Sequence, residues 1–187
     1  MRKIVTREWG SNEGVEALVT LANGELLAIV EGPKKGVHTS DAYLRLDGDW
    51  KPLSDLHDEG FRPTGATRLP DGDVLVIERC YNFGPCDGKK TIVRLRRLEA
   101  DSIVPGARLE GEEIAELKAP FIVDNFEGVA ARRGKKGETL VYLLSDDNGK
   151  YLKWVKEKTG KPKNEIGKPI QRTLLLMFEL KQKKKTE

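Results

Sequence analysis

The sequence predicts an all-β fold, a propeller-like array of about three four-stranded blades. One pattern occurs three times: a small-residue turn, an apolar strand, a Gly-centred turn, a second apolar strand and an acidic residue where that strand stops. Aligned on Gly14, Gly65 and Gly128, the copies lie 51 and 63 residues apart. Short strands in units of this length are typical of propellers, in which equivalent strand ends converge on one face.

The first unit, residues 10–58, contains the signals for four strands. Residues 15–21 and 25–30 read as strands and are joined by Ala22-Asn23-Gly24, a hairpin signal. Residues 42–46 alternate between apolar and polar side chains, and Asp47-Gly48 then turns the chain into residues 50–53. This order predicts a four-stranded meander.

The second and third units, residues 59–118 and 119–181, repeat the plan. In the second unit we expect strands at residues 65–69, 74–77, 91–98 and 113–118, with Asp71-Gly72 as the first turn. The third unit has strands at residues 129–132, 140–144 and 172–180 but lacks a fourth strand at its end. Residues 2–6 at the N-terminus can supply that strand, within the chain or in a partner.

Three blades make about half of a closed ring, because propellers usually have about four to eight blades. A second copy of the chain would complete a six-bladed homodimer, and the closure would bury both open edges. A fragment of a longer chain and an open array of three sheets are the alternatives.

Charge is distributed unevenly along the chain. The formal net charge is +3, but residues 149–187 hold twelve Lys or Arg against four Glu, which leaves −5 for the first 148 residues. Residues 149–168 form a basic insertion that we interpret as a solvated surface segment rather than a nucleic-acid contact, and residues 182–187 as a disordered tail. No apolar run is long enough for a membrane span, and no signal peptide is readable. An extracytoplasmic location stays open if the natural N-terminus is missing.

The two cysteines, Cys80 and Cys86, flank turn residues between two strand-like runs. A hairpin would bring them to disulfide distance, as in proteins of oxidising compartments, and two free thiols are the alternative. No CxxC pair or His cluster accompanies them, so a zinc site is not expected. The chain also lacks a Gly-x-Ser-x-Gly elbow, a Walker A loop and a Gly-x-Gly-x-x-Gly fingerprint, which disfavours hydrolase and nucleotide-binding α/β folds.

Acidic residues recur where each unit enters its first strand or ends its second. A single acid at such a place is usually a solvated turn residue, but recurrence in three radial units favours a shared site. Carboxylate oxygens gathered around a channel mouth suit Ca²⁺, which takes about six to eight oxygen ligands. The candidate metal ligands are Glu13, Glu16, Glu31, Glu78, Asp124, Glu127, Asp146 and Asp147.

Arginines occupy comparable boundaries, at Arg62, Arg79 and Arg172. The guanidinium group recognises phosphate or carboxylate with two parallel hydrogen bonds, so these positions are candidates for binding an anionic substrate.

Several segments together resemble one known family. These are residues 12–18, 61–79, 123–130, 145–148 and 171–176, beginning with Asn12-Glu-Gly-Val, Phe61-Arg-Pro-Thr-Gly, Val123-Asp-Asn-Phe-Glu-Gly, Ser145-Asp-Asp-Asn and Gln171-Arg-Thr. They are similar to the family described as having esterase-like activity of phytase, over most of residues 10–180. The resemblance implies a β-propeller related to calcium-dependent phytases, which hydrolyse phosphate esters. Family members are generally longer, and this chain resembles their C-terminal half.

The first functional hypothesis is therefore a Ca²⁺-dependent phosphoester hydrolase acting on a small phosphorylated or anionic substrate. Its expected catalytic residues are Glu127, Asp124, Arg62 and Arg79, and its substrate-binding residues are Arg62, Arg79, Arg172 and Asn125. The second hypothesis is a non-catalytic propeller that binds a ligand or protein partner over the same face. Calcium binding fits both, so an activity screen has to distinguish them.

Overall fold

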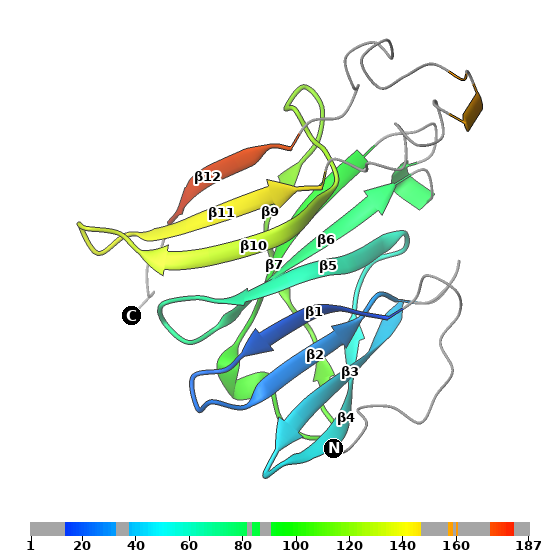
Figure 1. The fold of residues 1–187 in the computed structure, drawn as a ribbon. Helices are drawn as coiled ribbons and strands as arrows, with labels where there is room; N and C mark the ends of the chain where they lie inside the picture. The colour runs from blue at the N-terminus through cyan, green and yellow to red at the C-terminus, as the bar shows by residue number, and fades with distance from the viewer. Residues whose placement is uncertain are drawn as a thin grey trace.

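The chain folds into three antiparallel β-sheets that follow one another along the sequence (Figure 1). A computed structural model describes residues 14–32, 38–81, 84–86, 91–146, 157–158, 160 and 173–181. The first sheet contains β1 (Val15–Thr20), β2 (Leu26–Val30), β3 (Thr39–Leu46), β4 (Asp49–Leu56) and β8 (Arg108–Leu109). The second contains β5 (Phe61–Arg68), β6 (Val74–Tyr81), β7 (Thr91–Leu98) and β9 (Glu112–Leu117), and the third β10 (Phe126–Arg133), β11 (Thr139–Ser145) and β12 (Leu175–Leu180). The predicted all-β, propeller-like array is confirmed.

The first strands of the three sheets, β1, β5 and β10, are neighbours in space: β5 contacts β1 on one side and β10 on the other. From them each sheet runs outward as a meander, and the three sheets lie side by side (Figure 1). The hairpin turns are those that the sequence indicates. At Asp47-Gly48, for example, both residues have positive φ, 51° and 81°, as a two-residue type I′ turn requires.

Apolar side chains fill the two junctions between sheets. Strand β6 illustrates this, because its alternate side chains point to opposite faces. Val74 and Val76 join a cluster with the first sheet that includes Leu27 and Ile29. The intervening residues join a second cluster with the third sheet, which includes Leu75, Ile77, Phe126, Val141 and Leu143. The middle sheet is thus packed on both faces, and each outer sheet is packed on one.

Strand β8 was not expected from the sequence. It lies between the third and fourth strands of the second unit, yet it pairs in parallel with β4, so it crosses back to the first sheet. Backbone hydrogen bonds secure the crossing, from Ser54 N–H to the Ala107 carbonyl and from Gly106 N–H to the Pro52 carbonyl, both 3.0 Å. Two residues are too short a run to give a recognisable sequence pattern.

Cys80 and Cys86 form a disulfide with a Cα–Cα distance of 5.9 Å, which decides between the two alternatives that the sequence left open. Both half-cystines are fully buried and pack against Phe61 and Ile92. The bridge joins the end of β6 to the short 3₁₀ turn η1 (Gly84–Cys86), on the same side of the molecule as the starts of β1, β5 and β10.

Some expectations concern residues that the structure does not describe. The N-terminal segment 2–6, nearly all of the basic insertion 149–168 and the tail 182–187 lie outside the described residues. Ring closure by a second copy also stays a prediction. Among the residues that are described, no helix is long and apolar enough to cross a membrane.

Candidate functional site

The same irregularity occurs near the start of the first strand in every sheet. In β1, β5 and β10 the pairing with the next strand shifts by one residue, between Val15 and Ala17, between Pro63 and Gly65, and between Phe126 and Gly128. The extra residues of these β-bulges are Glu16, Thr64 and Glu127. In a β-bulge the extra side chain does not follow the regular alternation between the two faces of the sheet. Each of the three sheets therefore has one polar side chain in an irregular direction at an equivalent place.

The bulges also correct the alignment of the repeats. They make Ala17 of the first sheet equivalent to Gly65 and Gly128, whereas the sequence alignment used Gly14, three residues earlier. Glu16 therefore takes the position that the sequence comparison assigned to Glu13, which lies outside the described residues.

On the second strands, the corrected register makes Glu31, Arg79 and Asp146 equivalent. Glu31 N–H donates to the Gly14 carbonyl at 2.7 Å, Asp146 N–H donates to the Asn125 carbonyl at 2.8 Å, and Arg79 pairs with Arg62. Each of these residues directly follows the partner of the bulge. The middle unit thus places an arginine where the two flanking units place an acid.

These positions converge at one rim of the array. Partial burial and the negative charges of Glu31 and Glu127 raise the pKa of Glu16, and the Arg79 guanidinium opposes the shift. The four side chains come from all three sheets, and the other three each lie near enough to Glu16 to influence its pKa, so strand starts and strand ends meet around Glu16. Glu16 and Glu127 are exposed to solvent.

Two further residues extend this cluster. The guanidinium of Arg62 lies 3.7 Å from the carboxylate of Glu31. The side-chain amide of Asn125, a buried residue, donates a 2.6 Å hydrogen bond to Glu127. We call the set the rim group; it consists of Glu16, Glu31, Arg62, Arg79, Asn125 and Glu127.

Contacts between β5 and the backbone of β10 fix the position of Glu127. The hydroxyl of Thr64 donates a 2.8 Å hydrogen bond to the carbonyl of Phe126, directly before Glu127. A Cβ on Gly65 would lie 2.6 Å from the Glu127 carbonyl oxygen, so only glycine permits this approach of β5 to β10. The repeated glycine in the sequence signalled a turn; its actual role at Gly65 is close packing of neighbouring strands.

Two further acids of the third unit, Asp124 and Asp146, lie beside the rim group and are hydrogen-bonded to Asn125 or Phe126. Asp124 accepts a 2.7 Å hydrogen bond from the Asn125 N–H with its side chain, and its carbonyl accepts one from Phe126 N–H at 2.9 Å. Asp146 is joined to Asn125 by the backbone bond already described. Asp147 and Arg172 lie outside the described residues.

Glu78 does not belong to this cluster. It pairs with Pro63, one residue before Arg79, and adjacent residues of a strand point to opposite faces of the sheet. Its carboxylate is fully buried and accepts hydrogen bonds from Arg96, which also binds both carboxylate oxygens of buried Asp55 at 2.8 Å. Burial raises the pKa of Glu78 to about 7, against the opposing charge of Arg96.

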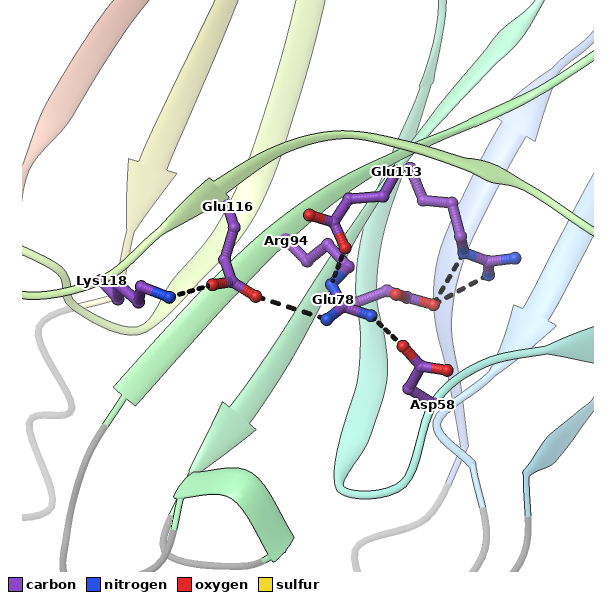
Figure 2. Close-up of polar contacts among 7 residues, drawn as sticks. Asp58, Glu78, Arg94, Glu113, Glu116 and Lys118 are labelled. Atoms are coloured by element: carbon purple, nitrogen blue, oxygen red, sulfur yellow. Dashed lines mark hydrogen bonds and ion pairs between the residues drawn. The ribbon is translucent and has the colours of Figure 1, made fainter.

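Figure 2 shows Glu78 beside a second, more exposed arginine cluster. Arg94 forms ion pairs with Asp58 at 2.5 Å, Glu113 at 2.8 Å and Glu116 at 3.3 Å, and Lys118 binds the other oxygen of Glu116 at 2.8 Å. The Arg94 guanidinium also lies 3.9 Å from the centre of the Phe61 ring. Acids satisfy this arginine on three sides, so its role is to join β7 to β9 and to the turn before β5.

His57, Asp55 and Ser40 form a buried polar group at the first junction that sequence reasoning did not find. Ser40 and His57 flank Gly32, and neither the Ser40 hydroxyl nor His57 Nε2 has a hydrogen-bond partner among the described residues. Burial lowers the pKa of His57. The contacts join residues far apart in the chain, so no local sequence signal could have found them.

Glu16, Glu31 and Glu127 offer the hard oxygen donors that Ca²⁺ prefers, and the charges of Glu31 and Glu127 both act on Glu16. Among the described residues, however, no three His, Cys, Asp or Glu side chains are arranged closely enough to form a ready metal centre. The rim group is therefore a mixed cluster in which Arg62 and Asn125 already hold two of the three carboxylates.

A comparison with protein families gives one match. The family model "Phytase-like: Esterase-like activity of phytase" matches residues 2–149. No curated protein and no solved structure matches the chain. The matched range contains every residue of the rim group.

Proposed function

Because the chain belongs to the phytase-like family, described by esterase-like activity of phytase, we propose that it hydrolyses phosphate esters at the rim group. The observation that carries the proposal is the meeting of Glu16, Arg79 and Glu127 from three different sheets at an exposed rim. Radial β-arrays place their ligand sites where equivalent strand ends converge, and this rim is such a place.

Arg79 and Arg62 are the proposed anion-binding residues. Their backbones pair directly across β5 and β6, so the two guanidinium groups start from neighbouring positions. The ion pair between Arg62 and Glu31 is long, at 3.7 Å. A phosphate, which carries more charge than a carboxylate and can form shorter hydrogen bonds, can therefore displace Glu31 from Arg62. Two guanidinium groups bound to one phosphoryl group would stabilise the negative charge that builds up on its oxygens during hydrolysis.

One acid of the rim group, Glu127, supplies proton transfer. In hydrolysis, the water oxygen forms a bond to phosphorus, the bond from phosphorus to the ester oxygen breaks, and the alcohol leaves with a proton. Glu127 is the proposed base that takes a proton from the water, oriented by the amide of Asn125. The leaving oxygen takes its proton from water at the exposed rim, because Glu16 is needed as a carboxylate in the cation site proposed next.

We also propose that Ca²⁺ binds between Glu16 and Glu31, because a cation would relieve the repulsion that Glu31 exerts on Glu16 and would leave Glu127 available as the base. When bound, the ion supplies positive charge that withdraws electron density from a phosphoryl oxygen. Asp124 and Asp146 lie beside Asn125 and are the next candidate ligands. Calorimetric titration of the protein with Ca²⁺, repeated with Glu16→Gln, tests this without any activity measurement.

The second candidate function is non-catalytic binding of an anion at the same rim. It is favoured by the ion pair between Arg62 and Glu31, which an anion can replace without any group acting as a base. Fold alone does not decide between the two candidates.

The deciding experiment is hydrolysis of 4-nitrophenyl phosphate and phytate by the purified protein, with Ca²⁺ or with a chelator. We expect Arg79→Gln and Glu127→Gln to lower kcat/KM by about 100-fold or more, as loss of one charge-stabilising group does. Arg133→Gln is the matched control, because this exposed arginine lies at the opposite end of β10. Turnover that is absent from the wild type, or unchanged in both rim variants, rules out catalysis at this site.

A further inference from the structure

A cavity of about 670 Å³ opens on the same side of the molecule as the rim group. Its lining is largely apolar and comes from Pro85, Ile92, Ala119, Phe121 and Val123, with Thr91 and Lys118 as the polar members. The volume lies within the range of about 300–1,000 Å³ that small-molecule sites occupy. No part of the proposed hydrolysis uses this cavity.

The cavity is joined to the rim group at two points. Val123 lines it, and Asn125 of the rim group follows two residues later in the chain. On the second sheet, Arg79 pairs with Val93 and Tyr81 pairs with Thr91, so Thr91 is the diagonal neighbour of Arg79. Diagonal neighbours on one face lie about 7–8 Å apart, within reach of a long side chain.

Apolar side chains around the opening stay in contact with solvent. Phe121 is 67% exposed although it lines the cavity, and Tyr81, opposite Thr91, is 56% exposed. Large aromatic side chains that remain exposed beside a hollow are typical of surfaces that bind an apolar partner. Among the described lining residues Lys118 alone is charged, and its ammonium group is already paired with Glu116 at 2.8 Å.

We propose that this cavity binds the apolar, preferably aromatic, group of an ester whose phosphate binds at Arg79 and Arg62. The inference rests on the proposed function and extends it by naming the substrate class: aryl or otherwise hydrophobic phosphomonoesters rather than small polar ones. The phosphoryl group would lie at the rim group, and the ring would pass between Thr91 and Val123 and pack against Phe121.

The test uses binding, so that it does not depend on turnover. Titration calorimetry compares 1-naphthylphosphonate with methylphosphonate, two ligands that carry the same anionic group and have no ester bond to hydrolyse. We expect the naphthyl compound to bind at least about tenfold more tightly, because burial of a ring contributes more than the 1.4 kcal/mol that a tenfold change requires.

Two variants locate the effect. Phe121→Ser should remove most of the naphthyl advantage and leave methylphosphonate binding unchanged. Ile122→Ser is the matched control, because Ile122 is the next residue, is 76% exposed and does not line the cavity. Equal affinity for the two ligands, no binding of the naphthyl compound, or equal losses in both variants would overturn the proposal.

Failure of the hydrolase proposal is recognised separately. A naphthyl advantage that depends on Phe121, in a protein that does not hydrolyse 1-naphthyl phosphate, supports the cavity site and rejects catalysis. Hydrolysis of methyl and naphthyl phosphates with equal kcat/KM rejects the cavity site and supports catalysis.

Discussion

The hydroxyl of Thr64 donates a 2.8 Å hydrogen bond to the carbonyl of Phe126, and both residues are buried where the second and third sheets meet. The bond crosses from one bulge to another, since Thr64 is the extra residue of β5 and Phe126 precedes the extra residue of β10. It therefore connects the packing of the sheets to the position of Glu127.

Replacement of Thr64 by valine keeps the shape of the side chain and removes the donor. We expect Thr64→Val to lower the free energy of unfolding by about 1–3 kcal/mol, because the Phe126 carbonyl would remain buried without this partner. Urea denaturation measures the change. Thr64→Ser keeps the hydroxyl and should lose less stability; a larger loss in Thr64→Ser would show that the methyl group, not the hydrogen bond, matters.

Gly65 offers a second test of the same junction. A methyl group there would lie 2.6 Å from the Glu127 carbonyl oxygen, and backbone atoms cannot move aside as a side chain can. We expect Gly65→Ala to cost about 1–3 kcal/mol of stability and to weaken binding of phosphate at the rim. Gly14→Ala is the control, since a methyl group added at Gly14 would meet no atom within 4 Å. Equal thermal stability of the two variants would contradict the close approach.

The main strands could be predicted from the sequence, but the pairing register at the start of each sheet could not. Hairpin signals such as Asp47-Gly48 depend on neighbouring residues, so the main strands and the convergence of their ends could be predicted. The Glu-Gly-Val at residues 13–15 matches the Glu-Gly-Val at residues 127–129, so the repeats were aligned on Gly14, three residues before Ala17, which the pairing register shows to be equivalent. In the second unit the strand end was chosen by its acid, Glu78, whereas the register places Arg79 at the rim. The bond between Arg96 and Asp55 joins residues 41 apart and could not be read from either segment.

Glu78 predicts a pH dependence of stability. One guanidinium, Arg96, faces two buried carboxylates, so one negative charge is not compensated, and burial raises the pKa of Glu78 from 4.5 to about 7. The folded protein then binds a proton that the unfolded chain releases between these values. The contribution of Glu78 to the free energy of unfolding should therefore fall as pH rises from about 4.5 to 7, by about 3–4 kcal/mol at most, and should level off above pH 7.

Urea titrations at a series of pH values measure this slope. Glu78→Gln carries no ionisable group and should remove this contribution between pH 4.5 and 7, while Glu138→Gln, a substitution in the β10–β11 turn, should leave it as in the wild type. His57, whose pKa is lowered by burial, makes stability rise with pH in the same window, so the test is the difference between the wild type and Glu78→Gln. A difference that does not fall as pH rises would mean that Glu78 is ionised in the fold.

The disulfide predicts a redox dependence of stability. Cys80 and Cys86 enclose a short loop, and cross-links of that size stabilise a fold by about 2 kcal/mol through the entropy of the unfolded chain. We expect the double variant Cys80→Ser, Cys86→Ser to lose at least this much, because it also puts two hydroxyl groups into the buried contact with Phe61. Thermal melting with and without a reductant checks it: the wild type should respond to the reductant and the double variant should not.

The two outer sheet faces predict an association. Leu144, Leu175 and Met177 are exposed on the third sheet, and Leu18 is exposed on the first, whereas both faces of the middle sheet are packed. Burial of exposed apolar side chains against another sheet is favourable, because it removes apolar surface from water. A second copy that closes the ring would bury both faces at once.

We expect sedimentation equilibrium to show a dimer at micromolar concentration and Met177→Glu to shift it to monomer. Val104→Glu, an equally exposed site in the β7–β8 connection, should leave the dimer intact. A wild type that remains monomeric at tens of micromolar would reject closure by a second copy.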